Sequence, residues 1–251
     1  MRSRVWGFST VLLCVLVFMT LSFTLRADVL LLDRFDQKLN TSIWTPSDAA
    51  AVYTIDGVAV LDQAASGGDW VNLVTNEAFP DCVIYYQYTF AERTGGGDGG
   101  GYLRQNPAGD GGYKIRWGWQ GENSVRLTDS VDHPPIAAWG EFPGLKSTFP
   151  ATTTHFEFKA SLVTPNIKVH ITDLDNDELI AEWELEDDWY ESGMLEFDNY
   201  IDGVYHIDNV IIATPDMEET IFSEKFDPET MEAAVEPGSK LATTWSKIKS
   251  Q

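Results

Sequence analysis

The feature that most constrains this chain is a succession of short alternating or apolar runs separated by turn residues. The runs that qualify as strands are 52–55, 58–61, 70–75, 83–90, 101–104, 113–119, 124–128, 154–161, 166–172, 178–184, 193–197 and 205–213. The segments between them are rich in Gly, Asn, Asp and Pro, which end strands and form turns. Helical periodicity is almost absent over the same stretch. About a dozen strands at this spacing predict an all-β protein, folded as a two-sheet antiparallel sandwich or a barrel.

Two hairpins can be predicted from local sequence. Asp56-Gly57 lies between strand residues and is a preferred pair for a tight type I′ turn. The second hairpin joins 166–172 to 178–184 through a polar loop at 173–177, which resembles the start of a calcium loop but lacks its glycine and its distal glutamate. In the first strand of this hairpin His170 lies on the face opposite the apolar residues, so we expect it on the solvent side or in a groove.

The N-terminus has the pattern of an export signal. Arg2 and Arg4 precede an apolar run over 11–23, and Ala27 supplies a small residue after it. This combination predicts a secretory signal peptide over residues 1–27, because an apolar run this short falls below the roughly 20 residues of a transmembrane helix. An uncleaved membrane anchor is the alternative.

Charge and cysteine content restrict the possible partners. Without residues 1–27 the one remaining cysteine is Cys82, so no internal disulfide can form, and its apolar context predicts a buried side chain. The formal net charge of −22 opposes binding to phosphate backbones, which excludes nucleic acid as a partner. The chain is therefore predicted to be an exported acidic protein, secreted or held at the cell surface or in a periplasm.

The C-terminal region differs in character from the rest. Residues 214–251 hold prolines at intervals and few β-branched runs, which predicts an extended or disordered tail. Near its end Leu241, Trp245 and Ile248 fall on one helical face in a locally basic stretch. This motif is either a peptide that docks to a surface component or a segment that packs on the domain or stays disordered.

The opening and closing strands resemble a known superfamily. Asp33, Phe35 and Trp44 form a D-x-F…W opening, and 207–210 form an I-D-N-V closing strand. Over residues 28–213 this pattern is similar to the concanavalin A-like lectin/glucanase superfamily, in particular to laminin-G-like modules and 3-keto-disaccharide hydrolase-like domains. The resemblance implies a jelly roll in which the first and last strands are adjacent and sugars bind along a concave face.

The same resemblance implies a structural calcium ion. Many members hold one near the terminal strands, and the matching position here is Asp208, with Asp33 and Asp69 as further candidate ligands. Calcium takes six to eight oxygen ligands, so a few carboxylates combined with carbonyls suffice. The alternative is that Asp208 only accepts hydrogen bonds from neighbouring backbone.

Catalytic motifs are missing from the sequence. The glucanases of this superfamily carry E-x-D-x-x-E or E-x-D-x-E on one strand, and neither complete pattern is present. The alternating acids Glu182 and Glu184 lack the central Asp, which favours a solvated strand face. No nucleophile elbow or zinc-protease motif is found, and four scattered histidines argue against zinc.

An aromatic stretch over 113–119 is the best candidate for a ligand site. Aromatic rings stack on the C–H faces of sugars, while polar side chains bind the hydroxyl groups. The candidate ligand-binding residues are Tyr102, Arg104, Arg116, Trp117, Trp119 and Gln120. Tyr113, Ile115 and Trp117 share one face of the strand, which is either this groove or part of the core; if it is core, Lys114 and Arg116 face the groove instead.

These observations favour a secreted, non-catalytic carbohydrate-binding or adhesion module. Two other hypotheses remain open, a glycoside-acting hydrolase of the same fold and a surface-attached interaction protein that uses its tail. Deeply buried carboxylates clustered in the groove would favour the hydrolase, because raised pKa values are typical of general acids.

Overall fold

The computed structural model describes residues 28–67, 70–93, 98–109, 111–118, 121–129, 140–200 and 203–231, and within them the protein is a sandwich of two antiparallel sheets. The eight-stranded sheet has the order β13 (Glu178–Glu186), β12 (Asn166–Asp173), β11 (His155–Val163), β6 (Cys82–Arg93), β15 (Gly203–Ala213), β4 (Val58–Asp62) and β3 (Val52–Ile55), with β1 (Val29–Asp33) also paired to β15. The seven-stranded sheet has the order β10 (Glu141–Thr148), β9 (Ser124–Thr128), β8 (Gly112–Trp117), β7 (Asp98–Gln105), β14 (Glu196–Tyr200), β5 (Val71–Thr75) and β2 (Trp44–Pro46). The predicted all-β jelly-roll sandwich is confirmed.

The first and last strands are neighbours, as the superfamily resemblance implied. Val29 pairs with Ala213 and Asp33 with Val210. The Asp56-Gly57 hairpin is also confirmed, since both residues adopt positive φ, 49° and 83°, as a type I′ turn requires. Two strands that the sequence did not indicate are β2, which is three residues long, and β10, which contains Pro143 and Gly144 and lacks alternation.

The core between the sheets is largely aromatic. Trp117 of β8 is fully buried and stacks on Tyr88 of β6, with ring centroids 5.4 Å apart, and it packs against Phe156 of β11 at 4.6 Å. Cys82 is 1% exposed, and burial raises the pKa of its thiol to about 12, so the prediction of an inert buried cysteine is confirmed.

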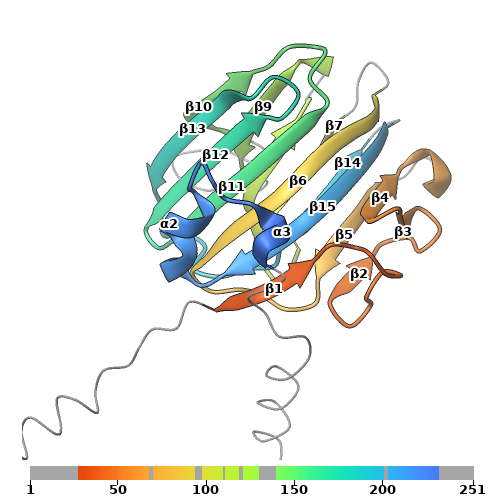
Figure 1. Ribbon diagram of the computed structural model, residues 1–251, viewed down its shortest axis with the longest axis horizontal. Helices are drawn as coiled ribbons and strands as arrows, with labels where there is room; N and C mark the ends of the chain where they lie inside the picture. The colour runs from red at the N-terminus through yellow and green to blue at the C-terminus, as the bar shows by residue number, and fades with distance from the viewer. Residues whose placement is uncertain are drawn as a thin grey trace, which may run out of the picture.

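The segment after the last strand corrects part of the predicted tail. Residues 214–231 were expected to be extended or disordered, but they form η3 (Pro215–Met217), α2 (Glu218–Ile221) and α3 (Pro228–Met231). Ile221 and Met231 are buried in a second apolar cluster with Tyr85 on the outer face of the eight-stranded sheet. Figure 1 shows α2 and α3 lying over this face. The predicted terminal motif over 241–248 and the signal segment lie outside the described residues.

Arg34 fastens this C-terminal segment to the start of the chain. Its guanidinium, which is almost fully buried, pairs with Glu229 and donates a hydrogen bond to the carbonyl of Pro228. Both partners belong to α3, so α3 lies beside the residue that follows β1.

Candidate functional site

The outer face of the seven-stranded sheet carries charged residues that are buried. On β8, Tyr113, Ile115 and Trp117 point into the core and are 0% exposed. Lys114 and Arg116 therefore point outward, yet they are only 2% and 8% exposed. Of the two interpretations left open by the sequence, the structure establishes the one in which Lys114 and Arg116 occupy the outer face.

Strand register brings polar residues from distant parts of the chain into one row. Asp198 of β14 pairs with Asn72 of β5 on one side and with Gly100 of β7 on the other. Gly100 in turn pairs with Arg116, and Arg116 pairs with Arg126 of β9. Because pairing residues share a face, the row Asn72–Asp198–Gly100–Arg116–Arg126 crosses five strands of the outer face.

An ion pair bridges β7, and at Gly100 the backbone of β7 lies close against that of β8. Lys114 on β8 and Asp198 on β14 form an ion pair although β7 lies between their strands, and both side chains are 2% exposed. Gly100 has φ of 153°, and an added Cβ would lie 1.9 Å from the carbonyl oxygen of Ile115. No other residue fits this position without a shift of the backbone.

Glu196 lies two residues before Asp198 and faces the same way. It is 3% exposed and accepts a hydrogen bond from the side-chain amide of Gln105. Burial, together with the neighbouring Asp198, raises the pKa of Glu196 to about 8. At neutral pH this carboxyl group therefore holds its proton and can donate a hydrogen bond or the proton itself.

Two exposed aromatic rings border this polar row. Trp70, just before β5, and Tyr200, at the end of β14, are 40% and 43% exposed, with ring centroids 5.2 Å apart. The Nζ atom of Lys114 lies 4.7 Å from the Trp70 ring centroid and 5.0 Å from that of Tyr102. The Trp70–Tyr200 pair is thus continuous with the buried row. We call Trp70, Tyr200, Tyr102, Lys114, Glu196 and Asp198 the outer-face site.

The structure brings together only some of the residues predicted from sequence. Tyr102 and Arg116 lie on the outer face, whereas Trp117 lies in the core. Trp119 and Gln120 fall outside the described residues.

Arg104 occupies a different place from the one expected. It is 1% exposed and donates to the carbonyl oxygens of Tyr190 and Leu162 at 2.7 and 2.8 Å, and to Thr164 and Asp81. These contacts tie β7 to the end of β11, so Arg104 stabilises the sandwich and is not part of the outer-face site.

Sequence reasoning overlooked the acidic pair on β14. Glu196-Phe197-Asp198 supplies the first two acids of the E-x-D-x-x-E pattern, but the third position is Ile201. An incomplete motif was counted as an absent one. The remaining signal was the alternation of two acids on a single strand, which places both on one face.

Two of the three predicted calcium ligands, Asp33 and Asp208, lie within the described residues. Both carboxylate oxygens of Asp33 accept hydrogen bonds at 2.8 Å, one from the backbone N–H of Phe35 and one from the indole of Trp44. Both oxygens of Asp208 are engaged in the same way, by the backbone N–H and the side-chain amide of Asn209 at 2.6 and 3.2 Å. Burial raises the pKa of this half-buried carboxyl group, with Glu229 and Asp36 adding to the effect. Asp69 is outside the described residues, and the described part of the chain holds no group of three or more His, Cys, Asp or Glu arranged for a metal. Calcium binding stays a prediction, with Asp208 as its main candidate ligand.

Comparisons with known proteins identify the fold. No known family profile matches the sequence, and no curated protein matches it. Among solved structures the chain is similar to the carbohydrate binding module CBM66 from Bacillus subtilis, with a TM-score of 0.50 and 14% identity over 68% of this chain and 95% of that one. It is also similar to a Bacillus licheniformis beta-glucanase, with a TM-score of 0.53 and 10% identity over 73% of this chain and 97% of that one.

A third similar structure is a non-specific endo-beta-1,3(4)-glucanase from family GH16. Its TM-score is 0.57 at 9% identity, over 75% of this chain and 95% of that one. All three are concanavalin A-like jelly-roll sandwiches, and this chain has the same fold. Within the described residues there is no helix long and apolar enough to span a membrane.

Proposed function

We propose that this chain is a secreted carbohydrate-binding protein and that the outer-face site binds the glycan. The observation that carries the proposal is the exposed Trp70–Tyr200 pair lying against the buried Lys114–Asp198 ion pair. Similar structures include a carbohydrate-binding module and glucanases, which supports a ligand of this class.

The chemistry of the site suits a sugar ring. Exposed indole and phenol rings stack on the C–H face of a pyranose or furanose, and the ring edges leave hydroxyl groups directed to polar neighbours. Asp198, Glu196 and Asn72 supply acceptors and donors on the adjacent rows of the sheet. A ligand bound here lies along the strand ends of β5 and β14, with its hydroxyl groups toward the polar row.

Glycan-array binding of the full chain tests this proposal. We expect specific binding that falls at least tenfold in Trp70→Ala, because an aromatic stack contributes most of the apolar contact. Trp189→Ala is the matched control. Its ring is 53% exposed, and the adjacent Tyr190 packs on Tyr113, whose side chain points to the core, away from the outer face of β8. Equal loss in both variants, or no binding by the wild type to any glycan, would contradict the proposal.

A second candidate function is hydrolysis of a glycoside. It is favoured by one observation, the burial of Glu196 and Asp198 on the same strand face, which raises the pKa of Glu196. Residues two apart on a strand point to the same face, so Glu196 and Asp198 form the kind of carboxyl pair that glycoside hydrolysis requires. Glu196 would then serve as the general acid.

Glu196→Gln separates the two functions. A binding protein keeps its affinity within a few-fold in this variant, because glutamine still donates and accepts hydrogen bonds, and the wild type releases no reducing sugar. A hydrolase retains binding while release of reducing sugar by the wild type disappears in the variant.

We also propose that a calcium ion stabilises the junction of the terminal strands through Asp208. The half-buried carboxyl group with its raised pKa supports this, since a bound cation offsets the cost of burying charge. Asp208 would supply a carboxylate ligand, and the chemistry contributed by the ion is structural.

A further inference from the structure

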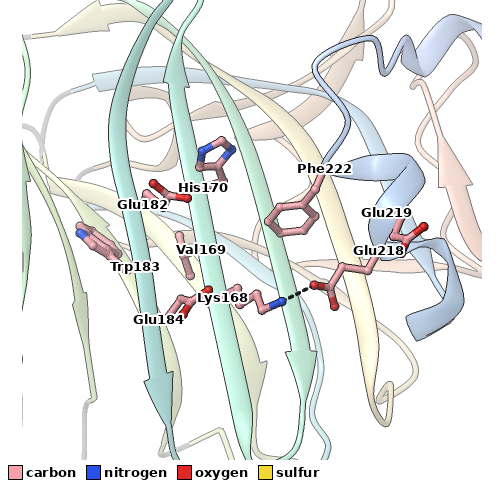
Figure 2. A pocket seen from close by; sticks show the side chains of 9 residues that line it. All are labelled: Lys168, Val169, His170, Glu182, Trp183, Glu184, Glu218, Glu219 and Phe222. Carbon is pink, nitrogen blue, oxygen red and sulfur yellow. Dashed lines mark hydrogen bonds and ion pairs between the residues drawn. The ribbon is translucent and has the colours of Figure 1, made fainter.

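A groove opens on the other sheet, away from the outer-face site. It has a volume of about 370 Å³ and runs between the outer face of β12 and β13 and the helix α2. Its polar lining consists of Lys168 and His170 from β12, Glu182 and Glu184 from β13, and Glu218 and Glu219 at the start of α2. Figure 2 shows these side chains, with the ring of Phe222 forming an apolar wall beside His170. We call it the acidic groove.

The charges that line the groove are unbalanced. Lys168 forms an ion pair with Glu218 at 2.6 Å, so this lysine is engaged by one of the four glutamates. Burial, assisted by Lys159, lowers the pKa of His170 and keeps its ring neutral at neutral pH, although Glu182 acts in the opposite sense. Glu182, Glu184 and Glu219 are all exposed. The groove therefore attracts a cation that also carries apolar groups for contact with Phe222.

A segment with that composition exists in the same chain. Residues 237–251 contain Lys240, Lys247 and Lys249 and no Asp or Glu, in a protein whose net charge is −22. The same segment carries Leu241, Trp245 and Ile248, which fall on one face if it is helical. It is thus basic and apolar together, complementary to the acidic groove.

The segment begins within reach of the groove. Met231, the last described residue, packs in one apolar cluster with Tyr85 of β6. Strand register places Tyr85, Lys159, His170 and Glu182 in one row across four neighbouring strands. Strands lie about 4.8 Å apart, so Glu182 is about 14 Å from Tyr85. The nine residues from Met231 to Lys240 extend to about 30 Å, more than twice that distance.

We propose that the basic C-terminal segment of this chain, residues 237–251, docks in the acidic groove of the same molecule. The lysines pair with Glu182, Glu184 and Glu219, and the apolar face contacts Phe222 and the stem of Lys168. The tether gives the segment an effective concentration in the millimolar range, so individually weak surface ion pairs are enough to hold it. Salt screens such pairs, and docking is therefore reversible with ionic strength.

Zero-length carbodiimide cross-linking of the full chain tests the proposal. Equal amounts of isotopically light and heavy protein are mixed at low salt, and cross-linked peptides are mapped by mass spectrometry. We expect links from Lys247 or Lys249 to Glu182, Glu184 or Glu219, within light or within heavy copies but not between them. Mixed light–heavy links would assign the groove to a second copy, and links scattered over the surface would show no docking; either result overturns the proposal.

Charge reversal supplies the matched variants. In Glu182→Lys/Glu184→Lys we expect the links to the unchanged Glu219 to fall about fivefold or more. In Glu77→Lys/Glu92→Lys, which changes the net charge equally at exposed sites outside the groove, we expect no change. Adding Lys247→Glu/Lys249→Glu to the groove variant restores hydrogen-exchange protection of residues 237–251. Thermal melting of each variant verifies that the sandwich is folded. If the variant with both charge reversals is folded but does not regain hydrogen-exchange protection of residues 237–251, the proposal is contradicted.

Discussion

Lys114 and Asp198 form an ion pair across an intervening strand. Their strands, β8 and β14, are separated by β7, whose Gly100 pairs with Asp198 on one side and with Arg116 on the other. A buried charge pair of this kind is seldom required for stability, since well-packed apolar residues often replace such pairs at no cost. Its position beneath the exposed Trp70 ring supports the proposed role in ligand binding.

Breaking the Lys114–Asp198 pair from one side is expected to destabilise the fold more than removing both charges. Asp198→Ala leaves the buried ammonium group without its carboxylate, with an expected cost of about 3–5 kcal/mol. Lys114→Met combined with Asp198→Ala is expected to cost less than the sum of the single changes. Urea unfolding of the wild type, the two single variants and the double variant measures the coupling free energy between Lys114 and Asp198. Additive costs would mean that the two groups do not stabilise one another.

Gly100→Ala is expected to be among the most damaging single changes in the chain. The added methyl group meets the carbonyl oxygen of Ile115 at 1.9 Å, so the backbone of β7 or β8 must move, at a cost of about 2–4 kcal/mol. Gly109→Ala is the control, because Gly109 also has positive φ, 76°, but has nothing within 4 Å of the added atom. Its expected cost is only that of the strained φ, about 1 kcal/mol. Thermal melting of both variants compares the two, and equal costs would contradict the steric argument.

The titration of Glu196 predicts how stability depends on pH. Its pKa is about 8 in the folded protein against an ordinary value of 4.5, so between these pH values the folded state holds a proton that the unfolded state has lost. The free energy of unfolding of the wild type should therefore fall as pH rises from 4.5 to 8, relative to Glu196→Gln, by a total of a few kcal/mol. Urea titrations at several pH values in this interval, with exposed Glu77→Gln as control, measure the difference. A constant difference would mean that Glu196 has an ordinary pKa.

Calcium is expected to raise the melting temperature of the full chain, and chelator to lower it. Ligand that binds only the folded state stabilises in proportion to the logarithm of its concentration above Kd. Asp208→Asn should abolish the response. Asp33→Asn should lower the melting temperature, because the single amide oxygen can keep only one of the two hydrogen bonds from Trp44 and Phe35, yet preserve the response to calcium. Loss of the calcium response in both variants would mean that Asp33 is a ligand as well. A wild-type melting temperature that does not respond to calcium would contradict the proposal.

The sequence predicted the class of fold because turn residues and alternation are local signals. It could not decide which face of β8 was the core, since the outward Lys114 and Arg116 are nearly as buried as the inward Ile115 and Trp117. Burial of both faces removes the contrast between polar and apolar sides on which such predictions depend.

Arg104 was misplaced for a different physical reason. Simple alternation puts Tyr102 and Arg104 on the same side of β7, but the register shifts between them. Such a bulge turns the following side chains to the opposite face, so Tyr102 remains on the outer face while Arg104 reaches toward Thr164. A bulge leaves little trace in sequence, and the site could not be assembled without the cross-strand register.

The pairing of β1 with β15 has a consequence for the order in which the molecule can assemble. Among the described residues, Val29–Asp33 pair with the strand that ends at Ala213, so β1 has no strand partner until all the intervening strands have been synthesised. Until then its backbone donors and acceptors have only water to satisfy them, and contacts of such large sequence separation form slowly. The eight-stranded sheet is consequently completed only after β15 has been made, and a chain that lacked β15 would also lose the pairing of β1.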